Sequence, residues 1–551
     1  MFMKQMDNEF VRDSEGSWVA PLPFRVPRQP LPSNRQQALH RANMLDTSLN
    51  RNPVKREHFL TFMSKILDNN HAELAPPLRK HEECWYLPLF GVYHPKKPDQ
   101  IRGVFDSSAK CNGVSLNSVL LTGPDLTNDL LGVLLRFRKE MVAVTADVQH
   151  MFHCFVVRKD HRNYLRFLWH KDNDLQENLV EYRMRVHVFG NSPSPAVATL
   201  GLRKAAQASE QEFGSHVTSF VTRDFYVDDG LTSCPTKEEA VKLMKDTQQA
   251  LAKYGNLRLH KKQTDHSERN FINDKQSLRS SGFLAPVIIQ GKLLLRKIVS
   301  ETVDWDQPLT DETADEWKSW RDTLIAIETL RIPRTYVPYL SKTTTKELHV
   351  FSDASEKAIA AVAYLRTTDS SGEPNIGFIL GKAKVAPTSG HTIPRLELSA
   401  AVLAVEITQT IMDNLDLHID TVKFYTDSKV VLGYISNETR RFFIYVANRV
   451  EKIRKFSSPS QWNYVSTNRN PADSGTRSVP AHAIHSSEWL LGPKQLLSSE
   501  QKNSEDIYQL IEPEEDGEIR ATVNVAKTFS TPEHKEDQRQ GPERDGRYET
   551  Y

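Results

Sequence analysis

Two adjacent aspartates, Asp228 and Asp229, follow an apolar and aromatic approach in the stretch DFYVDDGLTS, which spans residues 224–233. Neighbouring carboxylates repel one another, and a divalent cation bound between them would offset that repulsion. The tip of an ordinary β-hairpin also favours Asp and Gly, because these residues tolerate a positive φ. The stretch alone therefore leaves a metal site and a simple turn both open.

A third carboxylate, Asp147, follows the apolar run MVAVTA, which predicts a short buried strand. A carboxylate in such a place is costly unless it is paired or binds a metal ion. Between Asp147 and the aspartate pair lies VFGNSPSPA, a Gly/Pro loop that would let a base or sugar approach the backbone closely. Beyond the pair, residues 236–255 predict an amphipathic helix, and the basic stretch NLRLHKKQT follows it. This order of elements favours the metal-site interpretation.

A second acidic set occurs in the C-terminal half of the chain. Three strand-like runs in succession and then alternating helix and strand predict a three-layer α/β domain there. Its acidic residues stand at strand ends, in the first turn of a helix that opens with Pro394, and in a later loop: Asp353, Glu397, Asp427 and Asp473. Helix caps and a turn aspartate would explain these positions without a metal ion. Their chain order favours a shared site at one edge of the sheet.

The composition excludes several classes of protein. With 551 residues, 26% charged and 39% hydrophobic, the chain is long enough for several globular domains. Its four cysteines form no CxxC pair, which argues against a disulfide scaffold or a zinc knuckle. Lys+Arg (71) balances Asp+Glu (70), but basic clusters with aromatics at 94–110, 136–139 and 158–166 suit a nucleic-acid groove or a solvated face. Without a signal peptide or membrane-spanning run, we expect a cytoplasmic or nuclear location and no membrane partner.

The sequence around these residues resembles the polymerase of BEL/Pao-type LTR retrotransposons. The resemblance covers most of residues 15–495 and includes RGVFDSSAKCNGVSLNSVLLTGPDL, LLRFRKEMVAVTADVQHMFHCFVV, VHVFGNSPSPA and FYVDDGL. It implies an α/β and α+β multidomain fold, in which reverse-transcriptase fingers and palm precede an RNase H-like three-layer domain. It also implies an RNA-directed DNA polymerase with ribonuclease H activity, whose partners are an RNA template, a DNA primer, an RNA–DNA hybrid and dNTPs.

The resemblance gives both acidic sets the same chemistry, which is two-metal phosphoryl transfer with Mg²⁺, or Mn²⁺ in its place. In the palm, the first aspartate of the adjacent pair is the firmer ligand. The implied catalytic and metal-binding residues are Asp147, Asp228 and Asp229 in the palm, and Asp353, Glu397, Asp427 and Asp473 in the RNase H-like domain.

Residues that contact the incoming nucleotide also follow from the resemblance. An aromatic gate would exclude a ribose 2′-hydroxyl, basic fingers residues would hold the triphosphate, a loop would line the pocket, and a lysine would protonate the leaving pyrophosphate. In that order these are Phe152; Arg102 with Lys96 or Lys97; Phe189 and Gly190; and Lys261, for which Lys262 is an alternative. Without a nucleotide site, Phe152 would be an ordinary core aromatic, and the basic fingers residues would be ordinary surface charges.

The resemblance divides the chain into five regions. They are an N-terminal pre-polymerase region (1–84), fingers and palm (85–275), a truncated thumb or connection (276–345), the RNase H-like domain (346–495) and a disordered polar tail (496–551). After residue 276 the sequence lacks the primer-grip hairpin and the start of the thumb that such polymerases carry. A second hypothesis therefore stays open: a degenerate or domesticated remnant that binds nucleic acid without polymerase turnover.

Overall fold

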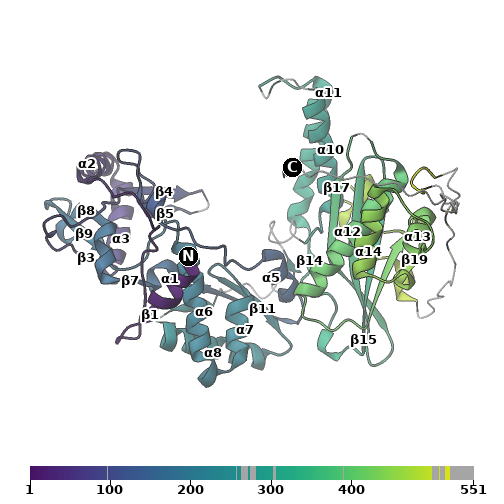
Figure 1. Cartoon of the computed structure of the whole chain (residues 1–551), viewed down its shortest axis with the longest axis horizontal. Helices are drawn as coiled ribbons and strands as arrows, with labels where there is room; N and C mark the ends of the chain where they lie inside the picture. Colours follow the sequence, from purple (N-terminus) through teal and green to yellow (C-terminus); the bar gives the residue numbers. More distant parts are fainter. Residues whose placement is uncertain are drawn as a thin grey trace, which may run out of the picture.

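The computed structural model describes residues 1–95, 97–255, 257–261, 271–272, 281–301, 304, 306–388, 390–498, 508, 510 and 516–520. The chain forms two bodies, one from the residues up to 261 and one from residue 281 onward, and α5 (Leu130–Phe137) lies between them (Figure 1). Both bodies mix helices and strands, as the sequence predicts. Within the described part of the chain, every helix is too short or too polar to cross a bilayer.

An antiparallel four-stranded sheet is the centre of the first body. Its order is β10-β11-β6-β12, from Phe225–Tyr226, Asp229–Cys234, Val142–Val148 and Leu259–Lys261. Side chains alternate along β6, so Val144, Ala146 and Val148 are buried in the core that α6 (Ser194–Phe213) and α8 (Lys237–Gly255) cover. Asp147 therefore lies on the opposite face of the sheet.

The first 84 residues are built into this body. In α1 (Phe2–Glu9), Phe2 and Met6 are buried in the core of the four-stranded sheet. β3 (Ala72–Leu74) extends a second sheet by pairing with β9. The other helices and strands of the first body are β1 (Val11–Arg12), β2 (Trp18–Ala20), α2 (Arg35–Arg51), α3 (Pro53–Asp68), β4 (Leu89–His94), β5 (Lys97–Phe105), α4 (Leu116–Val119), β7 (Val156–Val157), β8 (Arg166–His170), β9 (Leu179–Met184) and α7 (Ser215–Arg223).

A five-stranded sheet is the centre of the second body. Its strands run in the order β17-β16-β15-β18-β19, from Pro374–Val385, Ala358–Thr368, Thr345–Ala354, Thr421–Thr426 and Trp462–Tyr464. The first three pair antiparallel, and β15, β18 and β19 pair parallel. One face is covered by α12 (Ile393–Asn414), α13 (Lys429–Ser436) and α14 (Ile444–Phe456), and the other by α10 (Ala285–Glu301), α15 (Asp473–Arg477) and α16 (Glu488–Leu491). This is the predicted three-layer arrangement.

The core of the second body extends beyond residues 346–495. Phe283, just before α10, and Val287, in its first turn, pack in one buried cluster with Phe351 and Tyr364 of the sheet. The helix α11 (Asp311–Thr323) follows α10 and stands beside it (Figure 1). At the other end, Ile519 lies 4% exposed in the core on the α12 side, although most of residues 499–551 lie outside the described range. Segments on both sides of the predicted domain therefore complete its packing.

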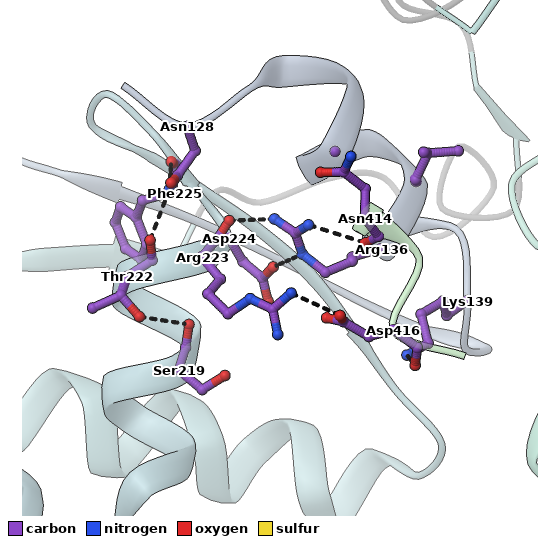
Figure 2. A network of polar contacts seen from close by, with 12 residues as sticks. Asn128, Arg136, Lys139, Ser219, Thr222, Arg223, Asp224, Phe225, Asn414 and Asp416 are labelled. Atoms are coloured by element: carbon purple, nitrogen blue, oxygen red, sulfur yellow. Dashed lines mark hydrogen bonds and ion pairs between the residues drawn. The ribbon is translucent and has the colours of Figure 1, made fainter. Parts of the chain in front are cut away.

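A polar network joins the two bodies at the base of the β10–β11 hairpin (Figure 2). Arg136, at the end of α5, pairs with Asp224 at 2.6 Å and donates to the carbonyl of Asn414, the last residue of α12, at 3.1 Å. Arg223 pairs with Asp416 at 2.7 Å, and Lys139 donates to the Asp416 carbonyl at 2.7 Å. The hairpin base is thus tied directly to the end of α12.

Arg138 forms the buried part of the same junction. Its guanidinium donates to the carbonyls of Arg334, Ile379 and Phe378 at 2.9, 3.2 and 2.9 Å. The ring centroids of Tyr336 and Phe283 lie 4.3 and 4.7 Å from its Cζ atom, within the range of cation–π attraction. Burial lowers the pKa of Arg138 to about 10, so the side chain stays protonated at neutral pH. Carbonyls and aromatic faces therefore stabilise a buried cation between the two bodies.

We expect Arg138→Ala to lower the free energy of unfolding by at least about 3 kcal/mol, because it leaves buried carbonyls without a donor and opens a cavity. Urea denaturation of the whole chain would measure the loss, and limited proteolysis would show whether the two bodies separate. Arg223→Ala is the matched control, since its ion pair crosses the same junction with side chains 45% and 36% exposed. That control should cost less than about 1 kcal/mol. Equal effects of the two substitutions would contradict the role given to Arg138.

Candidate functional site

The three palm aspartates come together through strand register. Asp229 at the start of β11 pairs directly with Asp147 of β6, and Asp228 is the neighbouring turn residue. One carboxylate oxygen from each of the three lies within 4.8 Å of the others, and all three side chains are partly buried. In the described part of the chain, this is the one set of three or more His, Cys, Asp or Glu residues that meets this distance. Three hard oxygen donors at this separation fit Mg²⁺ or Mn²⁺.

The backbone of the hairpin holds Asp228 over the sheet. Tyr226 pairs with Asp229, so Val227 and Asp228 are the two central residues of a tight turn. Val227 has a φ of +59°, a conformation that glycine usually supplies and that costs a β-branched residue about 1–3 kcal/mol. The Val148 amide donates to the Asp228 carbonyl at 3.0 Å and fixes the turn against β6. Local strain is thus retained at the position that orients a candidate metal ligand.

Three of the residues predicted to contact the nucleotide lie together. Phe152, in a 3₁₀ turn at Met151–Cys154, places its ring 5.9 Å from that of Phe189. The Arg102 guanidinium, from β5, lies 5.6 Å from the centroid of the Phe189 ring. Phe189 is 49% exposed, so this group of two tilted rings and a cation reaches solvent. Residues from three separate segments therefore form one cationic and aromatic surface.

Gly190 is fixed by its backbone. It has a φ of +111°, and a Cβ atom there would lie 2.9 Å from the Phe105 carbonyl oxygen, so a larger residue would be strained. The Asn117 amide donates to the Gly190 carbonyl at 2.9 Å and accepts from the Ser192 amide at 2.8 Å. Asn117 is a supporting residue that the sequence analysis missed, since it lies 73 positions from its partner and only the fold brings the two together.

The predicted lysines are described in part. The structure describes the backbone of Lys97, the first residue of β5, and of Lys261. Lys261 is the last residue of β12 and pairs with Ala146 of β6. Lys261 therefore lies one position beyond His260, the partner of Asp147. The side chains of both, and Lys96 and Lys262 altogether, lie outside the described residues. Their roles stay predictions.

The second acidic set meets at one edge of the five-stranded sheet. β15 and β18 run parallel with Ser352 opposite Thr426, so Asp353 and Asp427 follow side by side at the carboxyl ends of these strands. Asp473 begins α15. Glu397 is the fifth residue of α12, which places it in the second turn rather than in the predicted first turn, because the helix already begins at Ile393. The side chains of Asp353, Glu397 and Asp473 each have a close polar partner.

Burial and mutual repulsion dominate the electrostatics of this second set. Burial above all, with the neighbouring charges of Asp427 and Asp473, raises the pKa of Asp353 to about 7, although a hydrogen bond from the Thr476 hydroxyl opposes the shift. Burial also raises the pKa values of Glu397 and Asp473. Carboxylates that burial and like charges disfavour are suited to bind a cation, which restores the ionised form.

Two hydroxyls and an arginine orient this set. The Ser428 hydroxyl donates to Glu397, the Thr476 hydroxyl donates to Asp353, and the Arg477 guanidinium pairs with Asp473 at 2.7 Å. Within the described residues, the oxygens of this set are spread more widely than those of the palm, since no three of them meet the 4.8 Å separation. Their oxygen chemistry fits a hard divalent cation in a more open site.

Comparison with protein families identifies the second body. Residues 277–428 match the model described as the Pao retrotransposon-like RNaseH-like domain. This stretch is therefore similar to a Pao RNase H-like domain. The resemblance predicted from the sequence is thereby confirmed for this part of the chain. The match contains α10 and three of the four carboxylates of the second set, Asp353, Glu397 and Asp427, and it begins well before residue 346.

Solved structures give a further comparison, at 14% identity in each case. The chain resembles the foamy viral protease–reverse transcriptase dRH with double-stranded DNA (TM-score 0.47, covering 75% of this chain and 69% of that one). It also resembles the foamy viral protease–reverse transcriptase with an RNA/DNA hybrid (TM-score 0.45, covering 81% of this chain and 55% of that one). A third similar structure is the same protein with double-stranded DNA (TM-score 0.45, covering 75% of this chain and 82% of that one). A search of curated proteins finds no match.

Removing one palm carboxylate should weaken metal binding by the first body. We expect Asp228→Asn to lower the affinity for Mn²⁺ at least about tenfold, since it removes a charged ligand from a three-oxygen cluster. A Mn²⁺ titration followed by electron paramagnetic resonance would measure this. Asp246→Asn is the control, because that palm-side carboxylate pairs with His216 at 2.9 Å instead. Binding isotherms that Asp228→Asn leaves unchanged would contradict a metal site here.

Proposed function

We propose that this protein is an RNA-directed DNA polymerase with ribonuclease H activity from a Pao-type LTR retrotransposon. The observation that carries the proposal is the cluster of Asp147, Asp228 and Asp229 on the face of the palm sheet that α6 and α8 leave uncovered. The Pao RNase H-like domain supports the second activity. Nucleic acid would bind both bodies.

At the polymerase site, the three aspartates would hold Mg²⁺, which supplies an activated primer 3′-hydroxyl and charge neutralisation at the triphosphate when it is bound. The Arg102 guanidinium would donate to phosphate oxygens, as a planar fork of N–H groups does well. Phe189 holds Arg102 by a cation–π contact, and Phe152 packs against Phe189. In this arrangement the Phe152 ring would lie against the sugar and exclude a 2′-hydroxyl.

At the nuclease site, Asp353, Glu397, Asp427 and Asp473 would hold divalent metal beside the RNA strand of a hybrid. Thr476 and Ser428 hold two of these carboxylates by hydroxyl donation, which orients them before substrate arrives. Arg477 neutralises Asp473 in the absence of metal. The site residues would thus bind and orient the scissile phosphate from one edge of the sheet.

The second candidate is a remnant that binds nucleic acid without polymerase turnover. The sequence after residue 276, which lacks the expected primer-grip and thumb segment, favours it. The junction in question falls largely outside the described residues. Mg²⁺-dependent primer extension on an RNA template separates the two candidates. Because polymerisation needs the primer end held within about 0.5 Å of productive geometry, we expect hybrid cleavage to survive better than DNA synthesis.

Substitution of one carboxylate in each body should separate the activities. We expect Asp228→Asn to abolish dNTP incorporation and Asp427→Asn to abolish hybrid cleavage, each leaving the other activity intact, since the two sites lie in different bodies. Hybrid binding should change little, because Lys and Arg contacts to phosphate dominate affinity. Primer extension and cleavage of labelled RNA in a hybrid, assayed on each variant, would measure this. Loss of both activities in either variant would contradict two independent sites.

Sugar selectivity should depend on Phe152. We expect Phe152→Val to raise the incorporation of rNTPs relative to dNTPs at least about tenfold, because the smaller side chain removes the clash with the 2′-hydroxyl. Single-nucleotide incorporation kinetics would give the ratio. Phe155→Val is the control, since Phe155 is fully buried in the palm core and should affect stability without changing selectivity. An unchanged ratio in Phe152→Val would show that Phe152 serves the core.

A further inference from the structure

A cleft of about 910 Å³ lies between α10 and the edge of the nuclease sheet. One wall is the face of α10 that carries Arg296 and Lys297, and the other combines the β15–β16 turn at 355–357 with the end of α15. Figure 1 shows α10 running beside β17. The cleft is therefore a feature of the interface between α10 and the sheet.

Two residues of the cleft lining also contact the nuclease carboxylates. Thr476 lines it and also donates its hydroxyl to Asp353. Arg477 lines it and also pairs with Asp473 at 2.7 Å. A ligand in the cleft would therefore lie next to two of the four residues that we assign to the nuclease site.

The lining carries more basic than acidic side chains. It contains Arg296, Lys297, Lys357 and Arg477 against a single acidic residue, Glu356. Two of these cations also have acidic partners outside the lining, Arg477 with Asp473 and Lys297 with Glu316. The whole chain has a formal charge of only +1, so this excess is local. Such a surface attracts a polyanion, and the field is strongest where the charges share one concave wall.

Two of the cations are already held in place by the protein. Arg296 donates to the Ala386 carbonyl at 2.6 Å, which links α10 to the end of β17. Lys297 pairs with Glu316 of α11 at 2.9 Å. Lys357 is exposed at the turn between β15 and β16. The cleft thus combines two cations that the protein holds in place with an exposed one at its rim.

We infer that this cleft binds the sugar–phosphate backbone of the RNA–DNA hybrid beside its cleavage site, so that α10 forms one wall of the nuclease substrate site. The inference rests on the proposed ribonuclease H function. Contacts to phosphate position a duplex without reading its sequence, and Lys and Arg supply most of them.

The lining favours a nucleic-acid backbone over an isolated nucleotide. Among the described residues that form the cleft, none is aromatic, so a base would find no ring on which to stack. Leu293, Leu294 and Pro387 offer apolar contact of the kind that suits a sugar. The cleft therefore matches a strand of alternating sugars and phosphates that continues past the carboxylates.

The double variant Lys297→Gln, Lys357→Gln tests this inference in the full-length chain with a labelled RNA–DNA hybrid and Mg²⁺. We expect KM for cleavage to rise roughly three- to tenfold with kcat unchanged, since two phosphate contacts are lost while the metal-binding carboxylates remain. The slope of log affinity against log salt should become shallower by about one to two units. Glu356→Gln should act in the opposite sense and lower KM, because it removes the one negative charge of the cleft.

Lys318→Gln is the matched control, since Lys318 is an exposed lysine of α11 that does not line the cleft. It should leave KM and the salt slope unchanged. If cleavage proceeds and the double variant matches the wild type in KM and salt slope, the cleft inference is overturned and the nuclease proposal stands. If the wild-type chain does not cleave hybrids, the nuclease proposal fails. Fluorescence anisotropy of hybrid binding to the same variants then shows directly whether the cleft holds the backbone, and equal affinities would overturn it.

Discussion

Like charges held side by side by strand register are the constraint on which both halves of this structure depend. In the palm, pairing of β6 with β11 sets Asp147 opposite Asp229, and in the second body the parallel pairing of β15 with β18 sets Asp353 beside Asp427. In the palm, a slip of one residue would turn Asp147 into the core, because side chains alternate between the two faces of β6. Burial of apolar residues of β6 and β15 beneath the helices stabilises each sheet and offsets the repulsion between the carboxylates.

The junction between the two bodies relies on a different solution to the problem of buried charge. Arg138 and Arg334 both donate to backbone carbonyls at the junction, so the charge is spread over peptide dipoles and aromatic rings. Peptide carbonyls cannot be protonated or displaced by salt as surface carboxylates can. Exposed ion pairs at the rim, such as Arg223 with Asp416, contribute little free energy but orient the two bodies. Most of the stabilisation of the junction comes from the buried arginine.

Local sequence patterns were sufficient for the elements that carry the chemistry. The apolar run MVAVTA predicted β6 and the stretch around Asp228 and Asp229 suggested the β10–β11 turn, and Pro394 marked the start of α12 within one residue. What the sequence could not supply were contacts between distant segments. Asn117 supports Gly190 across 73 residues, and the apolar positions of α1 reveal a buried face but not the palm core that covers it.

The same limit applies to α10, whose apolar residues suit a connecting segment as well as a layer of the second body. Only the packing of Val287 against the sheet distinguishes the two, and that packing joins residues separated by most of a domain. Glu397 shows a milder form of this limit. Its helix was predicted, but its turn was not, because helix boundaries depend on capping contacts that a sequence specifies weakly.

The 22-residue helix α12 has a consequence for how two chemistries could share one duplex. It bears Glu397 near its start, and the carbonyl of its last residue, Asn414, accepts from Arg136 beside the base of the palm hairpin. At 1.5 Å per residue, the stretch from Glu397 to Asn414 is a rod of about 26 Å. A helix fixed at both ends would hold the two proposed sites at a constant separation. For a hybrid engaged at both proposed sites, degradation of the template would trail synthesis by a constant interval, set by the length of one helix.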